Sequence, residues 1–235
     1  MSTAERIKRR LKRRLLIVAG VFAITFGPCL VVGVIVGVGR MLGIFAPGPP
    51  PPPPDRPIVA RLKGDFAQQE AALRELLQTT PDRQQRDTVA AVKGVLRFGT
   101  PQLKIEALKV LALWGQAEDA AAVTPLLDGK WPGMAAQVVK TLGQLKGPAA
   151  AQALVDQLGK EQHDAAVQEL RGFGKDAEKP LLSRIKSDDP RVRKQVCELL
   201  GELGTEASVP ALRQATEDAD LGVRDTATGA LEKLK

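Results

Sequence analysis

The sequence has no tyrosine, one histidine and two cysteines, and aromatic residues make up only 3% of its 235 residues. A metal site with two imidazole ligands is excluded, because His163 is the only histidine. The two cysteines are not expected to pair, since Cys29 falls in an uncharged apolar run and Cys197 on a predicted core-facing helix. No HExxH, CxxC or serine-elbow motif occurs. The sequence therefore predicts no catalytic residue and no metal or cofactor ligand.

Each residue type that often carries chemistry has a structural interpretation here. We expect His163 to be a solvated residue in the first turn of a helix, and Cys197 to be a small buried hydrophobe. The carboxylate pairs Glu118-Asp119 and Asp188-Asp189 are expected at helix N-termini, where capping accounts for them. Three aromatic residues precede a glycine and are predicted to lie in the core: Phe98, Trp114 and Phe173.

The net charge of +7 is confined to one end of the chain. Residues 1–57 contain nine basic and two acidic residues, whereas residues 58–235 contain 25 of each. A basic protein is often a nucleic-acid binder, but a neutral domain without a basic stripe does not favour that class. We therefore expect no nucleic-acid partner.

An uncharged apolar run of 25 residues, Leu15–Gly39, follows seven basic residues in the first 14 positions. A helix of that length spans about 37 Å, enough to cross a bilayer once with some tilt. The basic cluster predicts a cytoplasmic N-terminus. We expect a cytoplasmic tail (1–14), a transmembrane segment (15–46, core 15–39) and an extracytoplasmic remainder, in a single-pass protein of the plasma (inner) membrane. A cleaved signal peptide is the alternative.

Two further features of this region have modest predictive value. Gly33 and Gly37 form a GxxxG pair that allows weak self-association, although glycines are common in membrane spans. Residues 47–57 read PGPPPPPPDRP, which favours a polyproline II spacer of roughly 30 Å. A docking site for a proline-recognising domain is the alternative for this linker.

A pattern recurs through residues 58–235. An apolar residue is followed after three residues by a leucine and then by a bulky apolar residue, usually before glycine, and no alternation typical of strands is present. The central leucines lie 28 to 31 residues apart: Leu111, Leu142, Leu170, Leu200 and Leu231. Helices are expected to begin at Pro101, Pro132 and Pro190, with Thr100 and Asp189 as N-caps, and to end at glycines in the left-handed conformation.

A second, shorter helix is expected after each glycine, with proline in its first turn in three of the units: Pro125, Pro180 and Pro210. The turn or helix after Gly115 is four residues longer than the others. Residues 59–98 predict one more helical pair, over 59–77 and 84–98, whose weaker match is typical of an end cap. Each unit is therefore a helix–turn–helix of about 30 residues.

These units resemble the HEAT-like repeat family in its short form, known from phycobilin lyase-type proteins. The resemblance is carried by DDPRVRKQVCELLGELGTEASVPALRQA at 188–215, echoed by Asp220-Leu221-Gly222-Val223-Arg224, and covers roughly residues 100–235. It implies an all-α fold, a right-handed α-α superhelix or solenoid over 58–235, tethered by the transmembrane helix and the proline-rich linker.

The resemblance also implies that the second helices line the concave side, where a partner would bind. Residues after the prolines form a candidate ridge: Asp128, Asp156, Gln157, Ser183, Arg184, Arg213 and Gln214. The main hypothesis is a membrane-anchored, non-catalytic scaffold or adaptor for a protein partner, without cofactor. Alternatives are a phycobilin lyase-like or chaperone-type repeat protein and a nucleic-acid-binding HEAT-like protein.

Overall fold

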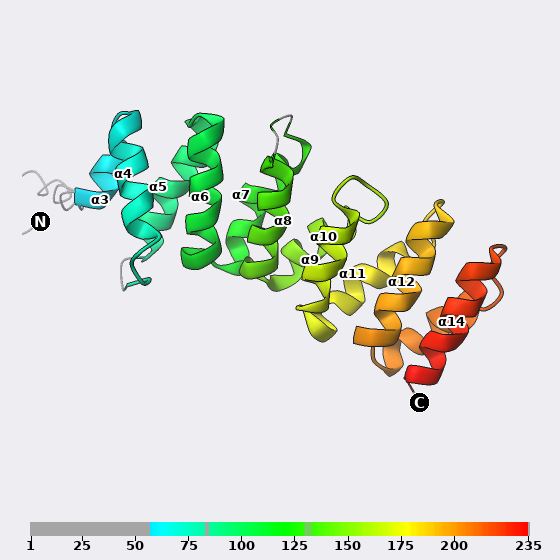
Figure 1. Ribbon diagram of the computed structural model, residues 1–235. Coiled ribbons are helices and arrows are strands. Elements are labelled where there is room, and N and C mark those ends of the chain that lie inside the picture. The colour runs from blue at the N-terminus through cyan, green and yellow to red at the C-terminus, as the bar shows by residue number, and fades with distance from the viewer. Residues whose placement is uncertain (1–56, 83–84, 130, 132, 235) are drawn as a thin grey trace, which may run out of the picture. The chain divides into compact units, whose positions relative to one another are not determined.

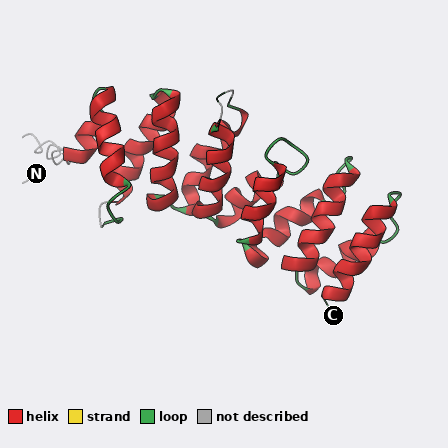
Figure 2. Cartoon of the chain, viewed as in Figure 1, coloured by secondary structure: helices red, strands yellow, loops and turns green. Residues whose placement is uncertain are grey.

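A computed structural model describes residues 57–82, 85–129, 131 and 133–234, which belong to one compact unit, Asp55–Lys235. These residues form helices, turns and no strand, as Figure 2 shows, so the predicted all-α class is confirmed for them. The basic tail 1–14, the apolar segment 15–46 with Gly33 and Gly37, and the linker up to residue 56 lie outside the described residues.

Over the described ranges, no helix combines the length and the apolarity that a bilayer crossing requires.

The N-terminal end consists of three helices, α3 (Pro57–Leu62), α4 (Phe66–Leu76) and α5 (Gln85–Phe98). The helix predicted over 59–77 is interrupted at Gly64 because Asp65 starts a new one: its carboxylate accepts from the backbone N–H of Gln68 at 2.9 Å. α5 matches the second predicted helix of this end unit closely.

The remaining helices form two layers, which run from the N-terminal to the C-terminal end in Figure 1. The first layer continues from α4 with α6 (Pro101–Trp114), α8 (Met134–Leu145), α10 (His163–Arg171), α12 (Pro190–Leu203) and α14 (Leu221–Lys233), each packed on its neighbour. Thr100 and Asp189 accept from backbone N–H groups of Leu103 and Arg191, which confirms both predicted N-caps. α8 begins at Met134, after Gly133 at φ 77°, and not at residue 132.

The second layer is made of short helices that return the chain between first-layer helices. It contains α5, η1 (Ala117–Asp119), α7 (Ala120–Val123), η2 (Thr124–Asp128), α9 (Gly147–Val155), η3 (Gly174–Ala177), α11 (Glu178–Arg184), η4 (Glu206–Ser208) and α13 (Val209–Ala215). The longer connection after Gly115 is therefore three short helical pieces. First-layer helices begin, and second-layer segments end, at one common edge of the unit, which we call the N-cap edge (Figure 1).

The core lies between the layers and is built from the recurring leucines. Leu111, Leu142, Leu170 and Leu200 are fully buried, while Leu231, in the last unit, is half-buried. Trp114 is also buried, as predicted, and its indole N–H donates to the carbonyl of Leu76 at 2.9 Å, which joins the end unit to the next. Phe173 is likewise buried.

Two sequence predictions about this core are wrong. Phe98 is 82% exposed, because α5 is a second-layer helix and its last residue lies at the N-cap edge, opposite to Trp114. Gly147 and Gly174 have positive φ (81° and 58°), as expected, but Gly115 and Gly204 are extended. At the extended positions glycine avoids a clash instead, since a Cβ on Gly115 would meet the side chain of Leu145.

Candidate partner-binding surface

The predicted ridge residues all lie on or just after second-layer segments, but they do not form one continuous row. Asp128, Ser183, Arg213 and Gln214 are exposed. Ser183 donates to the carbonyl of Pro180 at 2.6 Å, within the first turns of α11. These four residues are the part of the ridge that is accessible to a partner.

The other three ridge residues are less accessible. Asp156 is half-buried and accepts from the amide of Gln152 at 3.1 Å, and Gln157 is only 7% exposed. α9 ends at Val155, so both residues fall in the turn after it, out of register with their predicted equivalents in α11 and α13. Arg184 is half-buried, and its Nε has no hydrogen-bond partner.

Hollows occur between successive units on this layer. One of 630 Å³ lies between α5 and η1, where Lys93 Nζ is 2.6 Å from the buried Asp119 carboxylate. Asp119 also accepts from the backbone N–H of Gln116 at 2.9 Å, so the predicted capping role is confirmed and an ion pair between units is added to it. A second hollow of 530 Å³ lies between α9 and η3–α11, and Lys175, Asp176 and Lys179 line it.

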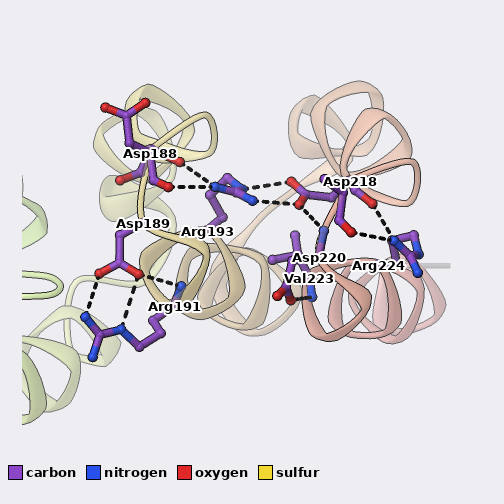
Figure 3. Close-up of polar contacts among 10 residues, drawn as sticks. Asp188, Asp189, Arg191, Arg193, Asp218, Asp220, Val223 and Arg224 are labelled. Carbon is purple, nitrogen blue, oxygen red and sulfur yellow. Dashed lines mark hydrogen bonds and ion pairs between the residues drawn. The ribbon is translucent and has the colours of Figure 1, made fainter.

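A third hollow of 560 Å³ lies near the C-terminal end, and the turns after α11 and α13 line it together with Gln214 of the ridge. Its floor includes Arg193 of α12 and Asp218, whose side chains form a two-pronged ion pair at 2.8 and 2.7 Å (Figure 3). Only about 15% of each side chain is exposed. The hydrogen bonds from Arg193 lower the pKa of the Asp218 carboxyl and raise the pKa of the guanidinium, so both groups are charged over the ordinary pH range.

The turns around this hollow are held by arginines at equivalent positions of successive helices. Arg193 donates to the carbonyls of Ser187 and Asp188 at 2.8 and 3.2 Å, and Arg224 donates to those of Asp218 and Ala219 at 2.7 and 3.0 Å (Figure 3). Each arginine therefore satisfies two carbonyls of the turn that precedes its helix.

The opposite edge of the same two units is held by Glu178. Its carboxylate accepts from the backbone N–H of Thr205 at 2.8 Å and from the hydroxyls of Thr205 and Ser208. Burial raises the pKa of Glu178, but the hydrogen bonds from Ser208 and Thr205 outweigh it and the net pKa is lowered. The units that enclose the third hollow are therefore joined at both edges.

These connections between units are not predicted by the sequence pattern. The Asp-x-x-x-Arg spacing occurs twice, at Asp189–Arg193 and at Asp220–Arg224. This repetition indicates that the two arginines occupy equivalent positions. It does not reveal that Asp218 is the partner of Arg193, since that pairing joins consecutive units 25 residues apart.

The chemistry-bearing side chains of the described part have structural partners. His163 is half-buried, and its Nδ1 accepts from the backbone N–H of Gly159 at 3.1 Å. Cys197 is buried as predicted, and burial raises the pKa of its thiol to about 11. Within the described ranges, no group of three or more His, Cys, Asp or Glu residues is arranged to hold a metal ion.

Residues 163–232 match the family model of HEAT repeats, so the resemblance seen at 188–215 is confirmed for that part of the chain. Similar solved structures include an engineered protein (17% identity, 77% of this chain and 97% of that one, TM-score 0.45). A designed armadillo repeat protein in complex with the peptide (KR)4 is 19% identical, over 76% of this chain and 98% of that one, with TM-score 0.43.

The complex of CpcE and CpcF of phycocyanin lyase from Nostoc sp. PCC7120 is also similar, with 18% identity over 79% of each chain and a TM-score of 0.42. No curated protein sequence matches the chain.

Proposed function

We propose that the chain is a single-pass membrane protein whose repeat unit is a non-catalytic scaffold that binds a protein partner. One observation carries the proposal: inter-unit hollows recur along the second layer, at α5–η1, at α9–α11 and at α11–α13. Neighbouring helices are about 8–10 Å apart, and an extended peptide covers that distance with about three residues. Hollows at three places along the unit suit a polypeptide, which can contact more than one of them, better than a single small ligand.

The charged side chains at the second and third hollows differ in net sign. The exposed Lys175 and Lys179 outnumber Asp176 at the second hollow. At the third hollow Arg193 and Asp218 neutralise each other, which leaves Asp188 and Glu217 against Lys186. A partner segment with acidic residues followed by basic ones complements this order.

Photo-crosslinking with the full chain tests the scaffold proposal. We expect a photoreactive residue in place of Ser183, on α11, to give a specific protein adduct in native membranes. The matched control is Gln168 on α10, which is also polar and exposed but belongs to the first layer. Equal adducts at the two positions, or an adduct only at Gln168, would contradict binding at the second layer.

The anchoring part of the proposal is supported by the uncharged run Leu15–Gly39 and the basic residues before it. We expect the chain to stay in the membrane fraction under alkaline extraction. Reporter fusions after residue 57 and at the C-terminus should both report an extracytoplasmic location. A cytoplasmic reading would overturn the orientation, and a mature N-terminus beyond residue 39 would establish a cleaved signal peptide instead.

The proposal that the unit is non-catalytic is supported by the surroundings of Cys197 and His163. A thiol whose pKa is about 11 supplies almost no thiolate near neutral pH, and His163 has its Nδ1 occupied by a backbone donor. Substituting Cys197→Ala or His163→Gln should therefore leave partner capture at Ser183 intact.

A further inference from the structure

Large apolar side chains that remain exposed in the described part gather at the N-cap edge. They are Phe66 (49% exposed), Phe98 (82%), Leu113 (56%), Trp131 (57%) and Leu221 (61%). Phe66 begins α4, Phe98 ends α5, Trp131 lies in the turn before α8, and Leu221 begins α14. Since first-layer helices begin and second-layer segments end at the N-cap edge, four of the five lie along it. Leu113, near the end of α6, lies at the opposite edge.

The three aromatic members occupy the N-terminal half of this edge, two in the end unit and one in the turn before α8, and we call them the aromatic edge: Phe66, Phe98 and Trp131. Burying rings of this size is strongly favourable, so three exposed rings on one edge are a cost unless something covers them. Arg97 lies over the ring of Phe98, with its guanidinium carbon 5.3 Å from the ring centroid. This arrangement places a cation beside the most exposed ring.

Acidic and basic side chains occur along the whole N-cap edge. Near the aromatic edge lie the basic Arg97 and Lys104 and the acidic Asp65 and Asp128. In the turns of the C-terminal half, Asp189 and Asp218 are paired with Arg191 and Arg193. Arg97 is therefore the cation that lies against the exposed rings, where it can attract an anionic surface.

We propose that the aromatic edge docks on the lipid bilayer, with its rings at the headgroup level and Arg97 toward anionic lipid. Aromatic rings favour this interface, and basic residues near an anionic membrane add attraction. The inference rests on the anchoring proposed above. Only 17 residues, 40–56, connect the apolar run to α3, and a linker of that number spans at most about 53 Å in a polyproline II conformation.

Because this linker is short, three rings are sufficient for docking on the bilayer. The linker keeps the repeat unit near the membrane at a high effective concentration, so weak contacts between the rings and the lipid form without a strong intrinsic affinity. Docking through the N-terminal half of this edge leaves the third hollow, at the C-terminal end, open to a partner. The edge thus orients the scaffold on its own membrane.

The two tryptophans of the chain make the proposal directly testable, because Trp131 is exposed and Trp114 is only 3% exposed. The full chain is reconstituted into nanodiscs containing anionic lipid, with either brominated or ordinary acyl chains. In Trp114→Phe, which retains only Trp131, we expect fluorescence to be lower in brominated lipid. In Trp131→Phe, which retains the buried Trp114, we expect equal fluorescence in the two lipids.

A second set of variants tests whether the edge makes the contact. In the Trp114→Phe background, Phe66→Ser with Phe98→Ser should abolish the quenching of Trp131, whereas Leu113→Ser on the opposite edge should leave it unchanged. All three side chains are exposed, so these changes are not expected to disturb the core.

The outcomes separate the two proposals. If the chain stays in the nanodiscs but Trp131 is not quenched, docking is overturned and anchoring stands. An unquenched Trp131 that is also shielded from aqueous acrylamide would assign the edge to a protein surface, which overturns docking as well. Quenching that survives the double serine change would place the lipid contact elsewhere. A chain that separates from lipid altogether overturns both.

Discussion

At the residue scale, Arg193 concentrates more interactions than any side chain shown in Figure 3, since it pairs with Asp218 and satisfies two turn carbonyls. We expect Arg193→Ala to lower the free energy of unfolding of the repeat unit by about 2 kcal/mol, the magnitude typical of hydrogen bonds to charged groups. Urea denaturation of a fragment spanning 55–235 measures it. Arg191 provides the control: it pairs with Asp189 but is 85% exposed, and Arg191→Ala should have no measurable effect.

The carboxylates of Asp218 and Glu178 predict a dependence of stability on pH. Both have pKa values below the ordinary 3.8 and 4.5, so their stabilising contribution is complete above those values. We expect the free energy of unfolding to fall as the pH drops below about 4.5 and on through the lowered pKa values. Asp218→Asn should make this decline shallower, because it removes one of the two titrating groups. An unchanged slope in Asp218→Asn would show that the pair does not contribute in this way.

At the element scale, the packing of α12 against α14 depends on Gly201. A Cβ at this position would lie 2.8 Å from both Cα and Cβ of Ala230, closer than side-chain atoms pack. Gly201→Ala should therefore push α14 away and cost about 1–3 kcal/mol, as overpacking does. Thermal unfolding of the same fragment measures the loss.

Gly229 on α14 is the matched control for this substitution. A Cβ there meets nothing within 4 Å, although the residue is also helical. Gly229→Ala should raise stability by about 0.5–1 kcal/mol, because alanine loses less conformational freedom in a helix. A loss of stability in Gly229→Ala similar to that in Gly201→Ala would mean that helix–helix distance is not what matters.

At the scale of the whole repeat unit, each helical pair is stabilised mainly by its neighbours. We expect Leu200→Ala, which truncates a fully buried side chain at a cost of about 2–5 kcal/mol, to accelerate amide hydrogen exchange in α10, α12 and α14. Exchange in α5 and α6 should stay unchanged. Leu111→Ala should give the reverse pattern, since it lies at the other end of the row. Uniform acceleration by both variants would indicate global cooperativity instead.

The repeat architecture was within reach of the sequence by itself. Leucines at intervals of 28 to 31 residues, prolines in first turns and the N-caps Thr100 and Asp189 predict helix pairs from local rules alone, and the described residues confirm them. The burial of Trp114, Phe173 and Cys197 follows from the same pattern, because the apolar face of a first-layer helix packs against the core. The break at Gly64 and the exposed Phe98 were missed because the end unit departs from the period.

Tertiary structure alone decided which side chains meet between units. The pairing of Arg193 with Asp218, of Lys93 with Asp119 and of Glu178 with Thr205 spans 25 to 27 residues, and local spacing cannot select one carboxylate among several. Tertiary structure also decided which ridge residues are exposed. Gln157 follows the end of α9 and is buried, whereas Arg213 and Gln214 lie on α13 and are exposed. The gathering of Phe66, Phe98 and Trp131 at one edge likewise arises from the antiparallel return of the chain. Periodicity determines which residues face inward, but contacts between units depend on how far each helix runs before it turns.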